Sequence, residues 1–260
     1  MTKRLSFEYE MILEFDDFIS NQQFQLRCVP KDGTYQRVES VAYSIFPTDL
    51  VSRMHDGFGN LIYVGSSLKK HKSFTFRVRG VIVTSSVPLA ESDYFHPIYK
   101  YETKLTMADQ NIKNFADKIN IDDYKDYAIA LMHLIYQEMT YAPGVTNIYT
   151  NAINAFALKK GVCQDYTHIM LSMLKYHGIP SRYVAGMMVG EGATHAWVEV
   201  FYKGFWFGVD PTNDRIVNED YFKLAHGRDY NDCIIDKGVF TGNCNQKQKQ
   251  KVKVKVKELK

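Results

Sequence analysis

The apolar residues of this 260-residue chain change their spacing once, near residue 100, and this change limits the possible folds most. From Arg4 to about Ser86 apolar and polar residues alternate, as Phe74, Phe76 and Val78 do. A period of two indicates β-strands with one buried face. The turn sequences "PKDG" and "DGFGN" separate the runs, so residues 1–100 are predicted to form an antiparallel β-sandwich.

Beyond a connector marked by Pro88 and Pro97 the pattern becomes helical, with helices expected at about 123–139, 151–158 and 163–177. Three extended runs follow: "SRYVAGMMVG", "HAWVEVFY" and "FWFGVD". The fold class is therefore expected to be α+β. Residues 101–260 would form a core of helices packed on an antiparallel sheet, with a further strand at the C-terminus.

The charge of the chain is concentrated at its C-terminus. Residues 246–260 hold seven lysines and one glutamate, a charge of +6, which leaves −3 for the rest of the +3 total. A mildly acidic body gives no reason to expect nucleic-acid binding. The tail "KVKVKVKELK" places Val252, Val254 and Val256 on one face and lysines on the other, which predicts a strand. A polyanion-binding arm is the alternative.

No signal for secretion, membrane insertion or metal binding is visible. Charges interrupt the apolar residues of "MTKRLSFEYEMILEF", and no later run reaches membrane-spanning length, so we expect a cytoplasmic protein without membrane contact. The cysteines 28, 163, 233 and 244 show no C-x-x-C pair and no zinc-ligand spacing, which predicts free thiols. No calcium-loop spacing is present either, so no metal or cofactor is expected.

Cys163 is expected at the start of a helix, where free backbone amides and a partial positive charge favour thiolate over thiol. Its own amide is a natural donor to an oxyanion. His168 lies about 140° around the same helix, and His177 lies about 21 Å along its axis. Neither histidine is therefore placed to act as the base.

A predicted hairpin brings His195 close to an aspartate. If the last two extended runs pair around Lys203-Gly204 through a two- or four-residue loop, Trp197 faces Asp210. His195 then lies on the same face as a diagonal neighbour of Asp210, with backbones roughly 7 to 8 Å apart. A three-residue loop would break this arrangement. Within it, His195 is predicted to take the thiol proton while Asp210 orients the imidazole.

Four neighbouring residues have open roles. Trp197 either walls the acyl site or belongs to the core, and both interpretations stand. Gln164 is a candidate oxyanion or substrate-binding residue next to Cys163, although with Asp165 it is more readily explained as support for the helix start. Asn213 either braces Asp210 or completes the turn "DPTN", and the turn is favoured.

Three segments carry a family resemblance: "GVCQDYTHIMLSMLKYHGIPSRYV", "THAWVEVFYKGFWFGVDPTN" and "HGRDY". They resemble the bacterial transglutaminase-like proteins, whose core has a papain-like fold with Cys, His and Asp in chain order. "DGFGN" resembles a turn of the β-rich domain that often precedes this core. The resemblance implies catalytic roles for Cys163, His195 and Asp210, and thiol-dependent acyl transfer or hydrolysis at amide bonds.

We therefore expect a cysteine hydrolase that forms a thioester from a peptide or glutamine-like amide and passes the acyl group mainly to water. The partner would be a peptide or protein substrate, and the oligomeric state stays open. An amine-accepting transglutaminase is the first alternative. A catalytically silent peptide-binding module is the second, although an intact Cys/His/Asp set argues against it.

Overall fold

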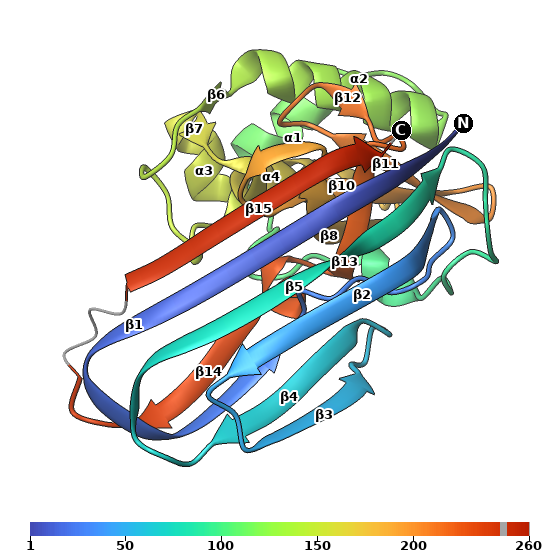
Figure 1. Ribbon diagram of the computed structural model, residues 1–260. Helices are drawn as coiled ribbons and strands as arrows, with labels where there is room; N and C mark the ends of the chain where they lie inside the picture. The colour runs from blue at the N-terminus through green and yellow to red at the C-terminus, as the bar shows by residue number, and fades with distance from the viewer. Residues whose placement is uncertain (245–248, 260) are drawn as a thin grey trace.

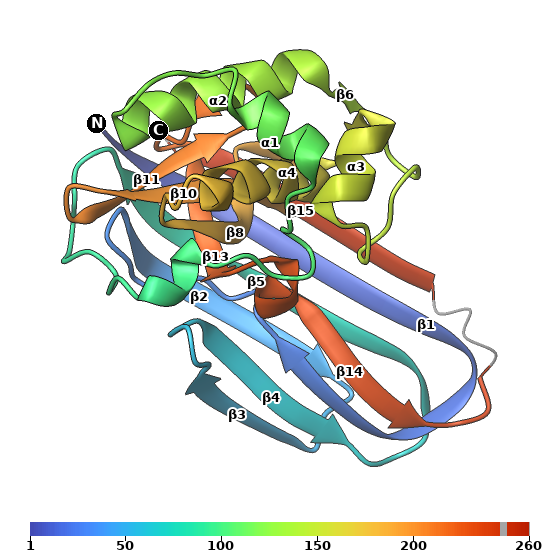
Figure 2. The same ribbon diagram turned by 180° about the vertical axis from the view of Figure 1, so that it is seen from behind.

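The computed structural model describes residues 1–244 and 249–259, and its α+β architecture confirms the predicted fold class. Two large antiparallel sheets contain most of the described strands, and the helices gather at one end of the molecule (Figures 1 and 2). The first sheet contains β1 (Thr2–Leu26), β2 (Gln36–Phe46), β3 (Leu50–His55), β4 (Leu61–Ser67), β5 (His71–Ser85), β9 (Gly190–Gly192), β14 (Asp236–Thr241) and β15 (Lys249–Leu259). The second contains β8 (Ser181–Met188), β10 (His195–Tyr202), β11 (Phe205–Asp210), β12 (Arg215–Ile216) and β13 (Tyr221–Gly227).

The helices are α1 (Gln110–Ala116), α2 (Tyr124–Glu138), α3 (Ala152–Leu158) and α4 (Cys163–Tyr176). Short 3₁₀ helices span Pro97–Lys100 and Tyr230–Cys233, and a small parallel pair joins β6 (Thr140–Tyr141) to β7 (Lys160–Gly161). Asp123 and Asn151 cap α2 and α3, because their side chains accept hydrogen bonds from backbone amides of the first turn. Helices expected near these positions are confirmed. No helix in the described part of the chain is long and apolar enough to cross a membrane.

The first sheet is one curled sheet, whereas the sequence suggested a sandwich within residues 1–100. The 25-residue strand β1 explains the difference, since its first half pairs with β5 and β15 and its last residues pair with β4 and β14. Between these halves the ladder with β5 is interrupted, from Glu14 to Ile19. The two halves of the curled sheet face each other, and Phe24 packs on Phe74 with 5.0 Å between ring centroids.

Strands from both ends of the chain complete this first sheet. β14 and β15 follow the helical region in sequence, yet both pair with β1. A division into residues 1–100 and 101–260 therefore follows the sequence pattern but not the hydrogen-bonded sheets. The reason is that a strand as long as β1 offers more edge than its sequence neighbours can pair, and the C-terminal strands occupy the remainder.

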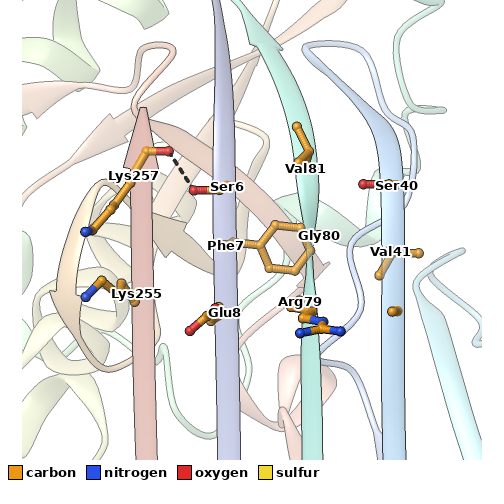
Figure 3. Close-up of a pocket in the computed structure, with 11 residues that line it drawn as sticks. Ser6, Phe7, Glu8, Ser40, Val41, Arg79, Gly80, Val81, Lys255 and Lys257 are labelled. Carbon is orange, nitrogen blue, oxygen red and sulfur yellow. Dashed lines mark hydrogen bonds between the residues drawn. The ribbon is translucent and has the colours of Figure 1, made fainter. Parts of the chain in front are cut away.

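The alternating tail forms a strand, as predicted. The side chains of Val254 and Val256 are buried, 5% and 2% exposed, while the side chain of Val252 lies outside the described part. Lys255 and Lys257 stand on the opposite, outer face of the sheet beside Glu8 and Ser6 (Figure 3). β15 thus contributes apolar side chains inward and charged side chains outward.

The turn "DGFGN" ties the first sheet to the second. Asp56 accepts hydrogen bonds from the backbone amides of Phe58 and Asn60, which fixes the turn. The Asn60 side chain then pairs with the backbone of His226 in both directions, at 2.8 Å each. Two of the segments that carry the family resemblance are therefore in direct contact.

The second sheet has the strand order β12-β11-β10-β8-β13, and α4 packs on β8 and β10. Lys203 and Gly204 alone connect β10 to β11, and both have positive φ angles of 47° and 90°. Such a two-residue loop matches the right-handed twist of the strands. The resulting register pairs Val198 with Val209, so the predicted hairpin is confirmed.

Candidate active site

Cys163 is the first residue of α4, as the sequence predicted. The helix start is built by Asp165, whose Oδ2 accepts hydrogen bonds from the Val162 amide and the Thr146 hydroxyl, both at 2.7 Å. A Cβ atom at Gly161 would come within 2.5 Å of that oxygen, so only glycine fits there. Burial raises the pKa of Asp165, while its hydrogen bonds oppose the shift.

His195 and Asp210 meet across the hairpin. His195 Nε2 lies 2.7 Å from Asp210 Oδ2, which is the contact expected from the register. Cys163 and His195 line the same cleft, so the thiol and the imidazole open into one space. Because Nε2 faces the carboxylate, Nδ1 is the ring nitrogen left for the thiol. The structure therefore brings Cys163, His195 and Asp210 together in the order that the sequence analysis expected.

The charges in this group support one another. Burial lowers the pKa of His195, but hydrogen bonds to Asp210 and Cys163, together with the charges of both groups, raise it to about 10. Burial likewise works against the Asp210 charge, and the His195 hydrogen bond and charge outweigh it, so the pKa of Asp210 is lowered. An imidazolium on His195 and a carboxylate on Asp210 are the forms favoured at neutral pH.

Asp210 is fully buried and receives several donors besides His195. The amides of Thr212 and Asn213 donate to Oδ1, at 2.9 and 3.3 Å, and form the expected turn. The Asn213 side-chain amide donates to Oδ2 at 2.8 Å. Asn213 therefore completes the turn and also braces the carboxylate, whereas only the turn was favoured from the sequence.

Tyr221 is the member of the site that the sequence analysis missed. Its hydroxyl donates to Asp210 Oδ2 at 2.9 Å. Tyr221 begins β13, which is separated from β11 by β10 and β8 in the sheet. No local spacing could have linked the two residues, because the contact depends on the curvature and strand order of the sheet.

Gln164 and Trp197 do not line the cleft that contains Cys163 and His195. Gln164 Nε2 donates to the Ile148 carbonyl at 3.3 Å, so it supports the neighbouring loop. Trp197 is 1% exposed and stacks beneath His195, with 6.3 Å between ring centroids. Trp197 is thus a core residue that supports the imidazole, and the alternative of a wall for the acyl site is wrong.

The cleft has a volume of about 910 Å³, and both Cys163 and His195 open into it. Most of its other side chains are aromatic, aliphatic or uncharged. They include Tyr136, Met139, Tyr141, Tyr166, Met188 and Val254. Glu191 is the one acidic residue of this lining within the described chain, and its carboxylate pairs with Lys255 at 2.8 Å.

His168 and His177 have structural roles, which agrees with their exclusion as the base. His168 is fully buried and accepts a hydrogen bond from the Tyr230 amide. Burial and the nearby Lys175 lower its pKa to about 3, so the ring is neutral. His177 lies 3.4 Å from Asp117 near the other end of α4.

All four cysteines are free thiols, as expected. Cys28 and Cys233 are fully buried, and burial raises the pKa of each thiol well above its ordinary value. Cys244, like Cys163, is partly exposed. In residues 1–244 and 249–259 no group of three histidine, cysteine or acidic side chains is arranged to hold a metal ion.

A cysteine at a helix start, facing a histidine and an aspartate on an antiparallel sheet, defines the transglutaminase-like α+β class. Two family descriptions match the sequence: "Transglutaminase-like superfamily" over residues 113–211 and "Bacterial transglutaminase-like N-terminal region" over residues 5–83. The chain belongs to the bacterial transglutaminase-like proteins.

Relatives and solved structures agree with this assignment. An uncharacterized protein of Mycobacterium leprae is 27% identical over 242 residues, which cover 84% of this chain and 86% of that protein. An uncharacterized Mycobacterium tuberculosis protein is 34% identical over 125 residues, 42% of this chain and 40% of that protein. The crystal structure of "a Putative Cysteine Protease from Cytophaga hutchinsonii" superposes with a TM-score of 0.81 at 19% identity. The superposition covers 100% of this chain and 92% of that one, so the two proteins share the same fold.

Proposed function

We propose that this protein is a cysteine hydrolase that acts on peptide or glutamine-like amide bonds through a thioester on Cys163. The observation that carries the proposal is the position of His195, which hydrogen-bonds Asp210 and opens into the same cleft as Cys163. A nucleophile, a base within hydrogen-bond reach and a group that orients the base are the three parts required for covalent acyl transfer.

In the first half of the reaction, Cys163 Sγ attacks the amide carbonyl carbon, and the carbonyl oxygen becomes an oxyanion. The Cys163 backbone amide, unpaired at the first position of α4, would donate to this oxygen. His195, protonated at neutral pH, gives its Nδ1 proton to the leaving nitrogen as the carbon–nitrogen bond breaks. The products are a thioester on Cys163, a free amine and a neutral imidazole.

The second half needs His195 as a base. Two of the influences that raise the pKa of His195 come from Cys163, through its hydrogen bond and its charge. Acylation removes both, so the imidazole then holds a proton less tightly than in the free enzyme. It can therefore take a proton from water, which attacks the thioester and releases the acid and the thiolate. Asp210 keeps the ring in position through both halves.

Water is the proposed acceptor because the described residues of the cleft present no charge arranged to hold an amine. An amine acceptor that is a cation at neutral pH would favour an unpaired carboxylate near the thioester. Glu191 is the one acidic residue of the described lining, and its carboxylate pairs with Lys255 on the outer face of the sheet. Without a positioned amine, water at its far higher concentration wins the competition.

The test incubates the intact protein with a panel of peptides and glutamine-containing amides, with and without a millimolar primary amine. Mass spectrometry separates acid from amide products. We expect acid as the main product, lost in Cys163→Ala and kept in Cys244→Ala, which removes the other partly exposed thiol. A dominant amide product that depends on Cys163 would replace the hydrolase by a transglutaminase. Absence of any Cys163-dependent product across the panel would favour the silent peptide-binding module.

A further inference from the structure

The C-terminal strand β15 lies between the rest of the first sheet and the active site. One edge of β15 pairs with β1 from Arg4 to Glu14. Its other edge pairs with the short strand β9, which ends three residues before His195. β15 therefore borders the cleft that contains Cys163 and His195, although it belongs to the first sheet and lies far from Cys163 in sequence.

The two faces of β15 have different neighbours. On the outer face, Lys255 pairs with Glu191 across the β15–β9 ladder at 2.8 Å, and Lys257 stands beside Ser6 (Figure 3). On the inner face, Val254 lines the cleft together with Cys163 and His195. Val254 therefore belongs to the active-site wall, although its strand completes the sheet of the first region.

Val256 is a close structural match for Val254 without this contact. Both valines are buried on the same face of β15, and both pair with a glycine of β9, Val254 with Gly192 and Val256 with Gly190. Val256 is not among the residues that line the cleft. Substitutions at Val254 and Val256 can therefore distinguish an effect on the cleft from an effect on packing alone.

We infer that Val254 determines which acyl-donor side chains the cleft accepts. Its partner in the ladder, Gly192, has no side chain, so Val254 supplies the apolar surface at this level of the wall. Met188 and Tyr141 line the same cleft and add further apolar surface. A wall of this kind favours an uncharged, apolar donor side chain, and its size limit is set by the valine. This inference rests on the proposed function and adds the substrate side chain to it.

The size of the effect follows from how apolar pockets discriminate. One methylene group more or less in such a pocket changes specificity by about 10- to 200-fold. Val254→Ala removes two methyl groups and opens the wall, while Val254→Phe adds bulk and closes it. Selectivity between small and large donor side chains is therefore expected to move in opposite directions in the two variants.

The test uses three chloromethyl ketone probes of the form N-acetyl-Ala-Ala-X. The residue X, next to the ketone, is alanine, leucine or phenylalanine. The Cys163 thiolate displaces chloride from the chloromethyl carbon, so a carbon–sulfur bond forms, the carbon–chlorine bond breaks and chloride leaves. Peptide mapping gives the rate of labelling at Cys163 for each probe. Iodoacetamide, which has no side chain, serves as the reference for the intrinsic reactivity of the thiol.

The quantity compared is the labelling rate of the phenylalanine probe divided by that of the alanine probe. We expect Val254→Phe to lower this ratio at least about tenfold and Val254→Ala to raise it. Val256→Ala should leave the ratio within about twofold, and iodoacetamide rates should be unchanged in all three variants. If Val254→Phe fails to fold by circular dichroism, Val254→Ala decides alone. A ratio unchanged in the folded Val254 variants overturns the inference. Failure of iodoacetamide to label Cys163 preferentially in the intact protein overturns the proposed function instead.

Discussion

Strand β10 carries His195 and Glu199 on one face, and each belongs to a buried polar cluster, but the two clusters differ in kind. The first, called the catalytic cluster after its proposed role, consists of His195, Asp210 and the donors around them, and it opens to Cys163 and the cleft. The ionic cluster consists of Glu199, Arg182, Asp93 and Lys223, with contacts of 2.6 to 3.3 Å. Trp197, between the two on the same face, separates them.

The difference lies in how the charges are balanced. The ionic cluster has two cations and two carboxylates. Burial alone would raise the pKa of Asp93, but the nearby charges of Lys223 and Arg182 outweigh burial and lower it. In the catalytic cluster a single carboxylate faces one imidazole, and that imidazole also faces a thiol. A buried charge therefore indicates chemistry only where a reacting group can exchange a proton with it. The ionic cluster is expected to serve stability, and the catalytic cluster activity.

The largest effect is expected from Asp210→Asn. The backbone amides of Thr212 and Asn213, which donate to Oδ1, would hold the new amide oxygen, so its NH₂ group takes the place of Oδ2 and faces His195 Nε2. The ring proton then moves to Nδ1, where it blocks acceptance of the thiol proton. We expect kcat to fall about 10⁴-fold with the fold intact. Asp214→Asn, in the same loop but paired with His133, is the control and should keep activity within about threefold. Near-normal activity of Asp210→Asn would remove Asp210 from the site.

Arg182→Met tests the ionic cluster. Arg182 is fully buried, and its loss leaves two carboxylates with Lys223 alone. Removal of one partner from a buried ion pair costs about 3–5 kcal/mol in the free energy of unfolding, measured by urea denaturation. The kcat/KM of the folded fraction should stay within about threefold. Arg4→Met, which breaks an exposed pair with Glu39, should have a much smaller effect on stability. Loss of activity without loss of stability in Arg182→Met would contradict the distinction.

The pH dependence of the reaction sharpens the same contrast. The pKa of His195 is raised to about 10, so the imidazolium is present at neutral pH and is lost as the pH rises through about 10. The stability that this pair contributes is complete below the ordinary histidine pKa and is lost over the same alkaline range. We expect kcat/KM to fall above about pH 10, tenfold per pH unit, with the titration belonging to the Cys163–His195 pair as a whole. A decline centred near pH 6.5 would show that Asp210 does not hold the imidazolium.

The smallest effect is expected from Tyr221→Phe. A hydrogen bond to a charged group contributes about 1.5 kcal/mol, so the loss of this donor to Asp210 should lower kcat about tenfold while KM is unchanged. The acid limb of the pH profile should also move upward, because the Tyr221 hydrogen bond helps to lower the pKa of Asp210. Tyr127→Phe removes another buried hydroxyl contact, to the Ala116 carbonyl on α1, and should leave both parameters unchanged. A changed KM with a normal kcat would assign Tyr221 to substrate binding.

The parts of the site that could be predicted from sequence depend on local geometry. Cys163 was placed by the pattern of one helix, and His195 and Asp210 by one hairpin whose two-residue loop fixes the register. The strand character of β15 followed from its own alternation. In each case the residues that decide the outcome are neighbours in sequence or across one tight turn.

The parts that could not be predicted depend on which strands become neighbours. Tyr221 reaches Asp210 only because β13 lies beside β8 in the second sheet. β15 inserts between β1 and β9, and alternation within a strand does not identify its partners. Trp197 was placed on the correct face, but whether its side chain reaches the cleft, as that of His195 does, depends on the packing of the residues around it.

Activation of Cys163 by His195 and Asp210 can be measured with limiting iodoacetamide at neutral pH. Peptide mapping measures the labelling of Cys163 against Cys244, the other partly exposed thiol, in the intact protein and in His195→Ala. We predict that Cys163 is labelled first in the intact protein and that its advantage over Cys244 is lost in His195→Ala. Preferential labelling of Cys28, Cys233 or Cys244, or an advantage of Cys163 that survives the loss of His195, would show that His195 does not activate Cys163.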